Sequence, residues 1–272
     1  MTMFGVVQMN SGMDPQDNLD VLDAQLAHLR IQGVRLVLTP ENCLVFGTKE
    51  DYEKHAEVLG HGPLQKKLSQ LAFEQGLWLV VGSFPIRNND GTLSTTCLVY
   101  DAAGNLRASY EKLHMFDVDI ADNHRSYRES DTFKSGDNLV LVDTPFGTLG
   151  LSICYDIRFP QLYSALRQRG ADIIAIPAAF TKVTGVAHWE VLLRARAIET
   201  QCWVLAAAQC GSHQGGRETY GHSMIVDPWG QVVTALGDQV GSAWAEIDLA
   251  SNSAIRNKMP VLQHARLQCA MK

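Results

Sequence analysis

Three side chains of different chemistry stand out in the sequence, because together they could hydrolyse an amide. Cys154 supplies a thiol, Glu41 a carboxylate and Lys112 an ammonium group. A carboxylate can accept the proton of a thiol that attacks a carbonyl carbon, and can later return it to the departing amine. An ammonium group can stabilise the oxyanion that forms in between. This set is sufficient without a metal ion or a cofactor, and we expect neither.

Each of the three residues lies at or just beyond the end of an apolar segment that we expect to be a strand. Ligands in open α/β sheets bind beyond the carboxyl ends of the strands, so the three side chains could meet in one cleft. A helix predicted from Pro160 follows Cys154 closely, and the backbone donors of such a turn favour the thiolate. Taken singly, each residue has an ordinary alternative: a core cysteine, a solvated loop Glu and a surface Lys.

The periodicity of apolar residues predicts helices that alternate with strands, with hairpins between them. Strands are expected at residues 4–9, 34–38, 77–81, 96–100, 106–110, 138–142, 148–153, 173–176, 202–208, 224–226, 232–234 and 243–247. Helices are expected at residues 15–33, 62–76, 160–169, 186–200 and 249–259. The run 77–81 is apolar on both faces, which indicates a sheet covered on both sides. We therefore predict an α/β four-layer sandwich in one domain that spans residues 1–272.

The composition excludes several classes of protein. Of 272 residues 46% are hydrophobic and 19% are charged, which argues against a disordered chain. The net charge is −6 and no Lys/Arg stripe is present, so we expect no nucleic-acid partner. No apolar run is long enough to span a membrane. The six cysteines form no CxxC pair and no zinc pattern, and no export signal is evident, so we expect a cytoplasmic protein with reduced thiols.

Three segments resemble the signatures of the nitrilase superfamily of carbon–nitrogen hydrolases, and they occur in the same order. The segments are Thr39-Pro-Glu41-Asn, Tyr110-Glu-Lys112-Leu-His and Ile153-Cys154-Tyr-Asp-Ile-Arg158-Phe-Pro. The resemblance runs across essentially the whole chain. It implies an α-β-β-α sandwich that associates into a homodimer or a higher homo-oligomer.

The resemblance also implies roles for the matching residues. Glu41 would be the general base, Lys112 the oxyanion stabiliser and Cys154 the nucleophile, with the N–H of Tyr155 as a second oxyanion donor. Many members have a second glutamate that orients the lysine, and Glu129 within residues 128–137 resembles it. Glu111 is the alternative because it adjoins Lys112, although neighbours on a strand point to opposite faces.

Three further segments resemble the branch of the superfamily that hydrolyses small amides of 2-oxo acids. They cover residues 178–199, 206–211 and 220–230. The resemblance implies hydrolysis of deaminated glutathione to 2-oxoglutarate and cysteinylglycine through a cysteine thioester. The alternative substrate is 2-oxoglutaramate, the substrate of an ω-amidase. We interpret the loop 212–218 as a mobile surface loop.

Three residues near the expected cleft suit a small anionic amide. Arg158 follows the nucleophile by four residues, and its guanidinium could bind a carboxylate in bidentate fashion. The alternative is a structural ion pair of Arg158 with Asp156 or another acidic residue. Phe180 and Thr184 lie in the predicted loop after the strand 173–176 and could supply an apolar wall and a hydroxyl contact. Their alternative is ordinary loop packing.

One hypothesis from another class of protein, the thiol redox proteins, stays open at this point. A thiol redox protein could use Cys154, but it would need an exposed thiol of low pKa and usually a second, resolving cysteine. A Cys–His protease is disfavoured, because no signature of that kind surrounds Cys154.

Overall fold

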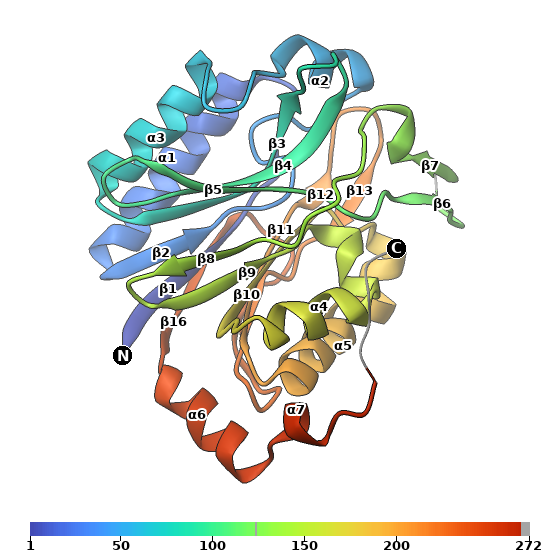
Figure 1. Cartoon of the computed structure of the whole chain (residues 1–272). Coiled ribbons are helices and arrows are strands. Elements are labelled where there is room, and N and C mark those ends of the chain that lie inside the picture. Colours follow the sequence, from blue (N-terminus) through green and yellow to red (C-terminus); the bar gives the residue numbers. More distant parts are fainter. Residues whose placement is uncertain (123, 268–272) are drawn as a thin grey trace.

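The computed structural model describes residues 1–122 and 124–267 of the chain (Figure 1). The strands are β1 Thr2–Gln8, β2 Val34–Leu38, β3 Trp78–Arg87, β4 Leu93–Tyr100, β5 Leu106–Glu111, β6 Asp117–Asp119, β7 Ser126–Arg128, β8 Leu141–Thr144, β9 Gly147–Leu151, β10 Ile173–Ala178, β11 Trp203–Ala208, β12 Cys210–Ser212, β13 Glu218–Tyr220, β14 Met224–Val226, β15 Val232–Ala235 and β16 Gly241–Ile247. The helices are α1 Pro15–Ile31, α2 Lys49–His55, α3 Pro63–Gln75, α4 Pro160–Gln168, α5 Lys182–Thr200, α6 Leu249–Lys258 and α7 Val261–His264. Two 3₁₀ turns, η1 Glu129–Asp131 and η2 Cys154–Arg158, complete the set.

Two six-stranded sheets with the same plan form the centre of the molecule. Their strand orders are β16-β1-β2-β3-β4-β5 and β15-β14-β11-β10-β9-β8. In each sheet three consecutive strands are parallel, β1-β2-β3 in the first and β11-β10-β9 in the second. Every other pair of neighbouring strands is antiparallel. The carboxyl ends of the parallel strands therefore gather at one end of each sheet, where the sequence predicts a cleft.

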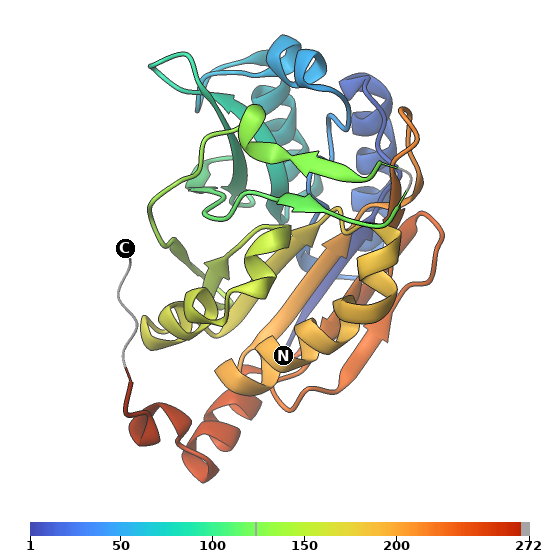
Figure 2. The same cartoon turned by 90° about the vertical axis from the view of Figure 1, so that its right-hand side faces the viewer.

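Helices cover the outer face of each sheet, and this confirms the predicted four-layer sandwich (Figures 1 and 2). Helices α1 and α3 lie on the first sheet, and α4 and α5 lie on the second. Helix α1 begins where expected, because the Asp14 carboxylate accepts a hydrogen bond from the N–H of Gln16 and Pro15 occupies the first turn. The leucines at three- and four-residue spacing are its buried face, Leu19, Leu22, Leu26 and Leu29. Strands β3 and β4 are almost wholly buried, as a sheet covered on both sides requires.

Several short elements were not expected from the sequence. They are the helices α2, of seven residues, and α7, of four, and the strand pairs β6–β7 and β12–β13, whose strands have three residues each. Such short elements show no recognisable hydrophobic period. Strand β3 also continues beyond the predicted end at residue 81, because an irregularity between Val81 and Phe84 accommodates Gly82 and Ser83 within the strand. The five described cysteines are buried and free, and Cys269 lies outside the described residues.

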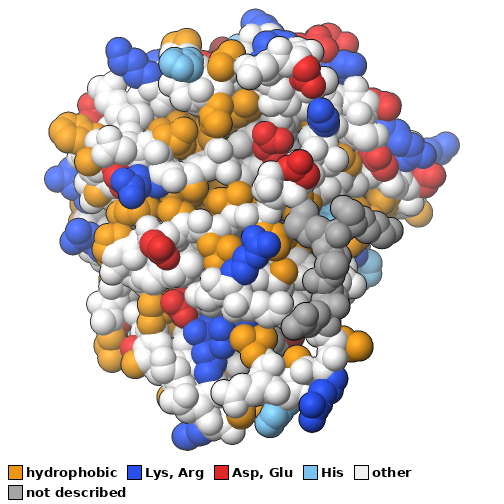
Figure 3. All heavy atoms as spheres, in the orientation of Figure 1, with side chains coloured by type: hydrophobic (Ala, Val, Ile, Leu, Met, Phe, Trp, Pro, Cys, Tyr) orange, Lys and Arg blue, Asp and Glu red, His pale blue; other side chains and the backbone are white. Residues whose placement is uncertain are grey.

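Charged side chains of both signs are mixed on the face of the molecule that Figure 3 shows. On the face in Figure 3, Lys and Arg side chains are scattered among acidic and apolar ones rather than gathered into a stripe. None of the helices within the described ranges is both long enough and apolar enough to cross a bilayer.

Candidate active site

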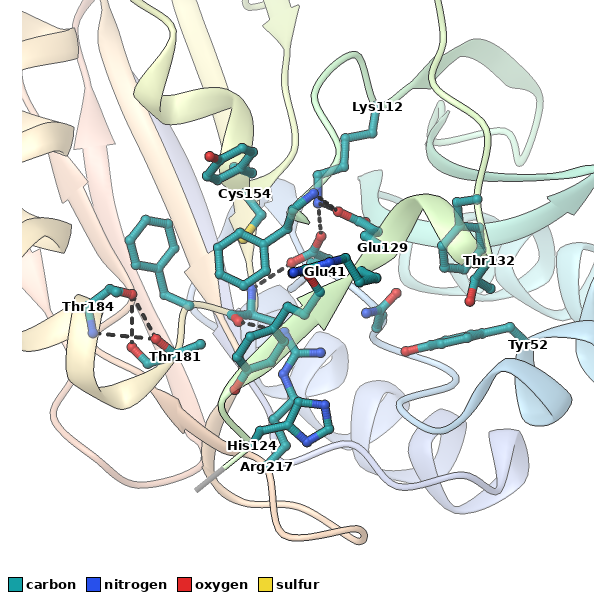
Figure 4. A pocket seen from close by; sticks show the side chains of 18 of the residues that line it. Glu41, Tyr52, Lys112, His124, Glu129, Thr132, Cys154, Thr181, Thr184 and Arg217 are labelled. Atoms are coloured by element: carbon teal, nitrogen blue, oxygen red, sulfur yellow. Dashed lines mark hydrogen bonds and ion pairs between the residues drawn. The ribbon is translucent and has the colours of Figure 1, made fainter. Parts of the chain in front are cut away.

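Four of the residues singled out in the sequence meet in one buried cluster (Figure 4). The Nζ of Lys112 donates to Oε1 of Glu41 over 2.8 Å, and to the two carboxylate oxygens of Glu129 over 2.9 and 2.8 Å. Figure 4 shows the thiol of Cys154 directed toward the same point. Lys112, Glu41 and Cys154 are each less than a tenth exposed. The cluster therefore places a thiol, two carboxylates and a cation side by side in a medium where charges interact strongly.

The cluster forms where strands of the two sheets end. Glu41 follows β2, Lys112 follows β5 directly, and Cys154 follows β9. A second anchor for Glu41 comes from the opposite sheet, since the N–H of Ala179, just after β10, donates to its Oε2 over 2.8 Å. Gln209, which follows β11, donates to the Glu41 carbonyl over 3.0 Å. Glu41 is thus held by Lys112, Ala179 and Gln209, which follow three different strands.

Cys154 lies in a tight turn whose backbone is held by Asp156. Cys154 has φ +47°, a left-handed conformation that costs about 1–2 kcal/mol for a residue with a side chain. The buried Asp156 accepts hydrogen bonds from the N–H of Ile153 over 2.8 Å and from the hydroxyl of Tyr110 over 2.7 Å. Its other oxygen contacts the N–H and Nδ1 of His114 over 3.1 and 2.7 Å. Four contacts to one carboxylate stabilise a turn that the backbone alone disfavours.

Tyr155 is the second residue of this turn. The first N–H groups of a helical turn have no acceptor within the turn, and this leaves the Tyr155 N–H suited to an oxyanion.

The charges fix the protonation states of the cluster at neutral pH. Burial, together with the nearby Glu41 carboxylate, raises the pKa of the Cys154 thiol well above its usual value. Burial would also raise the pKa of Glu41, but the charge and hydrogen bond of Lys112 outweigh it and lower that pKa. Burial would lower the pKa of Lys112, yet its two carboxylates raise it well above the usual value. The cluster therefore favours a neutral Cys154 thiol beside an ionised Glu41, because burial and Glu41 outweigh the backbone donors that favour the thiolate.

The structure brings Glu129, not Glu111, to Lys112. Glu129 begins the turn η1 and also accepts a hydrogen bond from the N–H of Phe116 over 2.7 Å. Glu111 is exposed, because it is the last residue of β5, directly before Lys112, and its side chain points to the opposite face.

A cleft of about 210 Å³ opens above the cluster and contains the remaining predicted residues. Tyr155, Arg158, Phe180 and Thr184 all line it. Thr184 lies in the first turn of α5 rather than in a loop, and its Oγ1 is 2.8 Å from that of Thr181.

Arg158 does not form the ion pair with Asp156 that the sequence left open. The oxygens of Asp156 are taken by the turn, as described above. The Arg158 guanidinium instead lies 5.2 Å from the centre of the Phe180 ring, with both Nη atoms 3.3 Å from Nδ1 of His188. It contacts no carboxylate of the described chain within 4 Å, so it is available to a ligand.

Sequence reasoning missed the far wall of the cleft. This wall is formed by the short hairpins β6–β7 and β12–β13 and the loops beside them. The first hairpin contributes Phe116, His124 and Tyr127, and the second contributes Arg217. Residues 214–216 are exposed, as in a surface loop, but the half-buried Arg217 turns back over the Phe46 ring at 4.9 Å and so lines the cleft.

The charge of the cleft is opposite to that of the chain. Its lining contains five cationic side chains, Lys49, Lys112, Arg128, Arg158 and Arg217. The two carboxylates that line it, Glu41 and Glu129, both bind Lys112. Within residues 1–122 and 124–267, no group of three or more His, Cys, Asp or Glu side chains could hold a metal ion. The arrangement suits an anionic substrate and covalent catalysis by a thiol.

Comparison with known proteins agrees with this geometry. Residues 4–257 match the carbon–nitrogen hydrolase family. A protein of Yersinia enterocolitica named deaminated glutathione amidase is 49% identical over 263 residues, which cover 96% of this chain and 92% of that protein. A human protein of the same name is 41% identical over 271 residues, which cover 98% of this chain and 83% of that protein.

Solved structures share the fold. The nitrilase–Fhit fusion protein NitFhit of Caenorhabditis elegans superposes with a TM-score of 0.89 at 39% identity, over 97% of this chain and 65% of that chain. An amidase from Nesterenkonia sp. AN1, whose active-site cysteine had undergone Michael addition of acrylamide, superposes with a TM-score of 0.81 at 26% identity, over 97% of this chain and 100% of that chain. The chain therefore belongs to the carbon–nitrogen hydrolase family, the nitrilase superfamily, as the three motifs predicted.

Proposed function

We propose that this chain is an amidase that hydrolyses deaminated glutathione to 2-oxoglutarate and cysteinylglycine, with Cys154 as its nucleophile. The observation that carries the proposal is the contact of Lys112 with both Glu41 and Glu129 beside the Cys154 thiol, in a cleft that is lined by more cations than carboxylates. The substrate rests on the relatives named deaminated glutathione amidase, which are similar over nearly the whole chain.

The first half of the reaction forms a thioester. Glu41 accepts the proton of the Cys154 thiol while the sulfur attacks the amide carbon, so no free thiolate has to be present beforehand. The resulting oxyanion accepts hydrogen bonds from Nζ of Lys112 and the N–H of Tyr155. As the C–N bond breaks, the protonated Glu41 gives its proton to the leaving amine, which departs as cysteinylglycine.

The second half regenerates the enzyme. Water enters the place left by the amine, and Glu41 accepts one of its protons as the oxygen attacks the thioester carbon. The oxyanion is held as before, the C–S bond breaks, and the proton held by Glu41 returns to the sulfur. The product acid is 2-oxoglutarate. Each half begins and ends with an ionised Glu41, so a single carboxylate serves both.

A carboxylate of the substrate orients the scissile amide in the cleft. Arg158 lacks a carboxylate partner within the described chain and is placed to bind the acyl-side carboxylate of the substrate. Phe180, which is buried against the Arg158 guanidinium, supplies an apolar wall, and Thr184 supplies a hydroxyl at the cleft. The thiol-redox alternative has no support here, because it needs a thiol of low pKa whereas burial and Glu41 raise the pKa of Cys154.

We also propose that the chain works as a cytoplasmic homodimer or higher homo-oligomer. Helix α5 exposes Val186 and Val191, and the exposed Trp229 lies in the turn that Arg194 fastens to that helix by a 2.8 Å hydrogen bond from its Nε to the carbonyl of Gly230. Large apolar side chains exposed on and beside one helix favour association with a second copy. The five free cysteines within the described chain suit a reducing compartment. Sedimentation velocity of the purified protein tests the assembly, and a monomer at micromolar concentration would contradict it.

Steady-state hydrolysis of two substrates tests the proposed activity, with Cys154→Ala as the blank. We expect kcat/KM for deaminated glutathione to exceed that for 2-oxoglutaramate at least tenfold, about 1.4 kcal/mol of discrimination. A preference for 2-oxoglutaramate would make the protein an ω-amidase instead. Cleavage of neither substrate above the blank would refute the substrate assignment.

A further inference from the structure

Arg217 is a cation of the cleft that the mechanism above does not use. It lies between β12 and β13, with its guanidinium carbon 4.9 Å from the centre of the Phe46 ring and 5.3 Å from that of Tyr127. Both rings are buried, and they hold the guanidinium in place from the sides.

The hydrogen-bonding capacity of Arg217 is largely unused. Its Nε is buried and has no hydrogen-bond partner within the described chain. One Nη donates over 3.3 Å to the carbonyl of Ala179, and no described carboxylate lies within 4 Å of the guanidinium. A buried donor left unpaired is unfavourable, so a ligand that accepts a hydrogen bond from it would bind favourably.

The other cations of the cleft are differently engaged. Lys112 binds Glu41 and Glu129. Arg128 donates to the carboxylate of Asp119 over 2.9 Å. Lys49 is exposed and donates to the carbonyl of Asp131.

Only two guanidiniums of the described cleft are therefore without a carboxylate. They flank one short segment, since Arg217 binds the carbonyl of Ala179 whereas Arg158 lies over the ring of Phe180. They share no aromatic partner, because Arg158 lies against Tyr155 and Phe180 and Arg217 against Phe46 and Tyr127. Two separate positions for anions follow.

The position of Arg217 relative to the base indicates which end of a substrate it would meet. The Ala179 residue that accepts from Arg217 also donates its N–H to Oε2 of Glu41. Glu41 must protonate the leaving nitrogen, so that nitrogen lies against Glu41 when the C–N bond breaks. A substituent on the nitrogen then extends past Glu41, toward the side where Arg217 lies. The acyl half stays with Cys154 and Arg158.

We propose that Arg217 binds a carboxylate on the leaving-amine half of the substrate and thereby selects amides whose departing amine is itself an anion. The inference rests on the proposed amidase function and deepens it: the cleft binds a substrate with one carboxylate on each side of the scissile bond. Arg217 is a specificity residue, and it touches no reacting atom.

The test compares deaminated glutathione with its C-terminal carboxamide, which differs only in that the terminal carboxylate is neutral. Wild type, Arg217→Gln and Arg217→Lys are assayed on both compounds. Arg107→Gln is the control for loss of an arginine elsewhere, because Arg107 lies outside the cleft lining and its guanidinium is 3.9 Å from the carboxylate of Asp101. Binding of both compounds to the Cys154→Ala protein, with and without Arg217→Gln, is measured by titration calorimetry and does not depend on turnover.

We expect wild type to prefer the acid over the carboxamide in kcat/KM by roughly tenfold or more, as for other charge-assisted contacts. Arg217→Gln should bring this ratio close to one, chiefly through KM, because the contact is made equally in the ground state and the transition state. Arg217→Lys should keep part of the preference, and Arg107→Gln should keep all of it.

The outcomes separate this inference from the proposed function. Hydrolysis of both compounds with equal efficiency by wild type, or an equal loss on both in Arg217→Gln, would overturn the role of Arg217 and leave the amidase standing. Binding to Cys154→Ala that depends on both the carboxylate and Arg217, without turnover by wild type, would support the role of Arg217 and refute the function. Absence of binding to Cys154→Ala would overturn the inference.

Discussion

Replacing Lys112 with methionine removes the cation that lies between two buried carboxylates. Both Glu41 and Glu129 place an oxygen 2.8 Å from its Nζ, so those oxygens are at most about 5.6 Å apart. Two unit charges at that separation repel by about 3 kcal/mol at an effective dielectric constant of about 20. Breaking a buried ion pair by removal of one partner typically costs 3–5 kcal/mol. We expect Lys112→Met to lower the free energy of unfolding by about 3–5 kcal/mol at pH 7.

The loss should depend on pH in a direction that the structure fixes. Burial already raises the pKa of Glu129, so without Lys112 the carboxylate pair takes up a proton above the usual glutamate range. A carboxyl group whose pKa is raised in the folded state stabilises the protein at low pH, and this stability is lost as the pH rises through the raised value. The difference between Lys112→Met and wild type should therefore grow from pH 5 to pH 8.

Urea unfolding of four proteins across this pH range provides the assay. Lys134→Met is the control for loss of an exposed cation, since Lys134 forms only an open 3.4 Å pair with Asp90, and it should cost less than about 1 kcal/mol. The double variant Lys112→Met/Glu129→Gln removes the repulsion and should recover part of the lost stability. A loss no larger than that of Lys134→Met, a loss independent of pH, or no recovery in the double variant would refute the reasoning.

Three further predictions concern the same cluster. Because Lys112 lowers the pKa of Glu41, kcat/KM should fall in acid only below about pH 4.5. Because burial raises the pKa of Cys154, the pH–rate profile should show no limb from thiol ionisation up to pH 9. A limb near pH 7 would contradict these protonation states. Glu129→Gln should lower kcat about 10- to 100-fold, as loss of an orienting partner does, whereas Glu111→Gln should stay within twofold; equal effects in the same steady-state assay would reject the choice of Glu129. Asp156→Asn should destabilise the protein by about 2–3 kcal/mol in urea unfolding, because a buried acceptor of four contacts becomes part donor; a change below 0.5 kcal/mol would show that the nucleophile turn does not need it.

The sequence could predict the centre of the site because strand ends in an α/β sheet are readable from hydrophobic patterns. Glu41, Lys112 and Cys154 each end an apolar run, and parallel strands bring such ends together. Alternation along a strand also argued correctly against Glu111, because a residue next to Lys112 must face the other way.

What the sequence could not provide depends on burial and on loops. The expectation of a thiolate considered the local turn of Cys154 alone, whereas the pKa of its thiol is set by burial and by Glu41, which is 113 positions away in the chain. Arg217 reaches the cleft only because β12 and β13 pair and return the chain over Phe46. Three-residue strands leave no periodic pattern, so neither the hairpin nor its arginine could be placed beforehand.

The second carboxylate has a purpose in the proposed mechanism that follows from the charges. A base that lies beside a lysine alone would be too weak to accept a thiol proton, because the cation stabilises its ionised form. Glu129 shares the charge of Lys112 with two hydrogen bonds and so moderates its effect on Glu41. When Cys154 attacks, the negative charge of Glu41 moves to the oxyanion while Lys112 contacts both positions. The net charge of the buried cluster then stays constant through the step, which keeps the reorganisation of a low-dielectric site small.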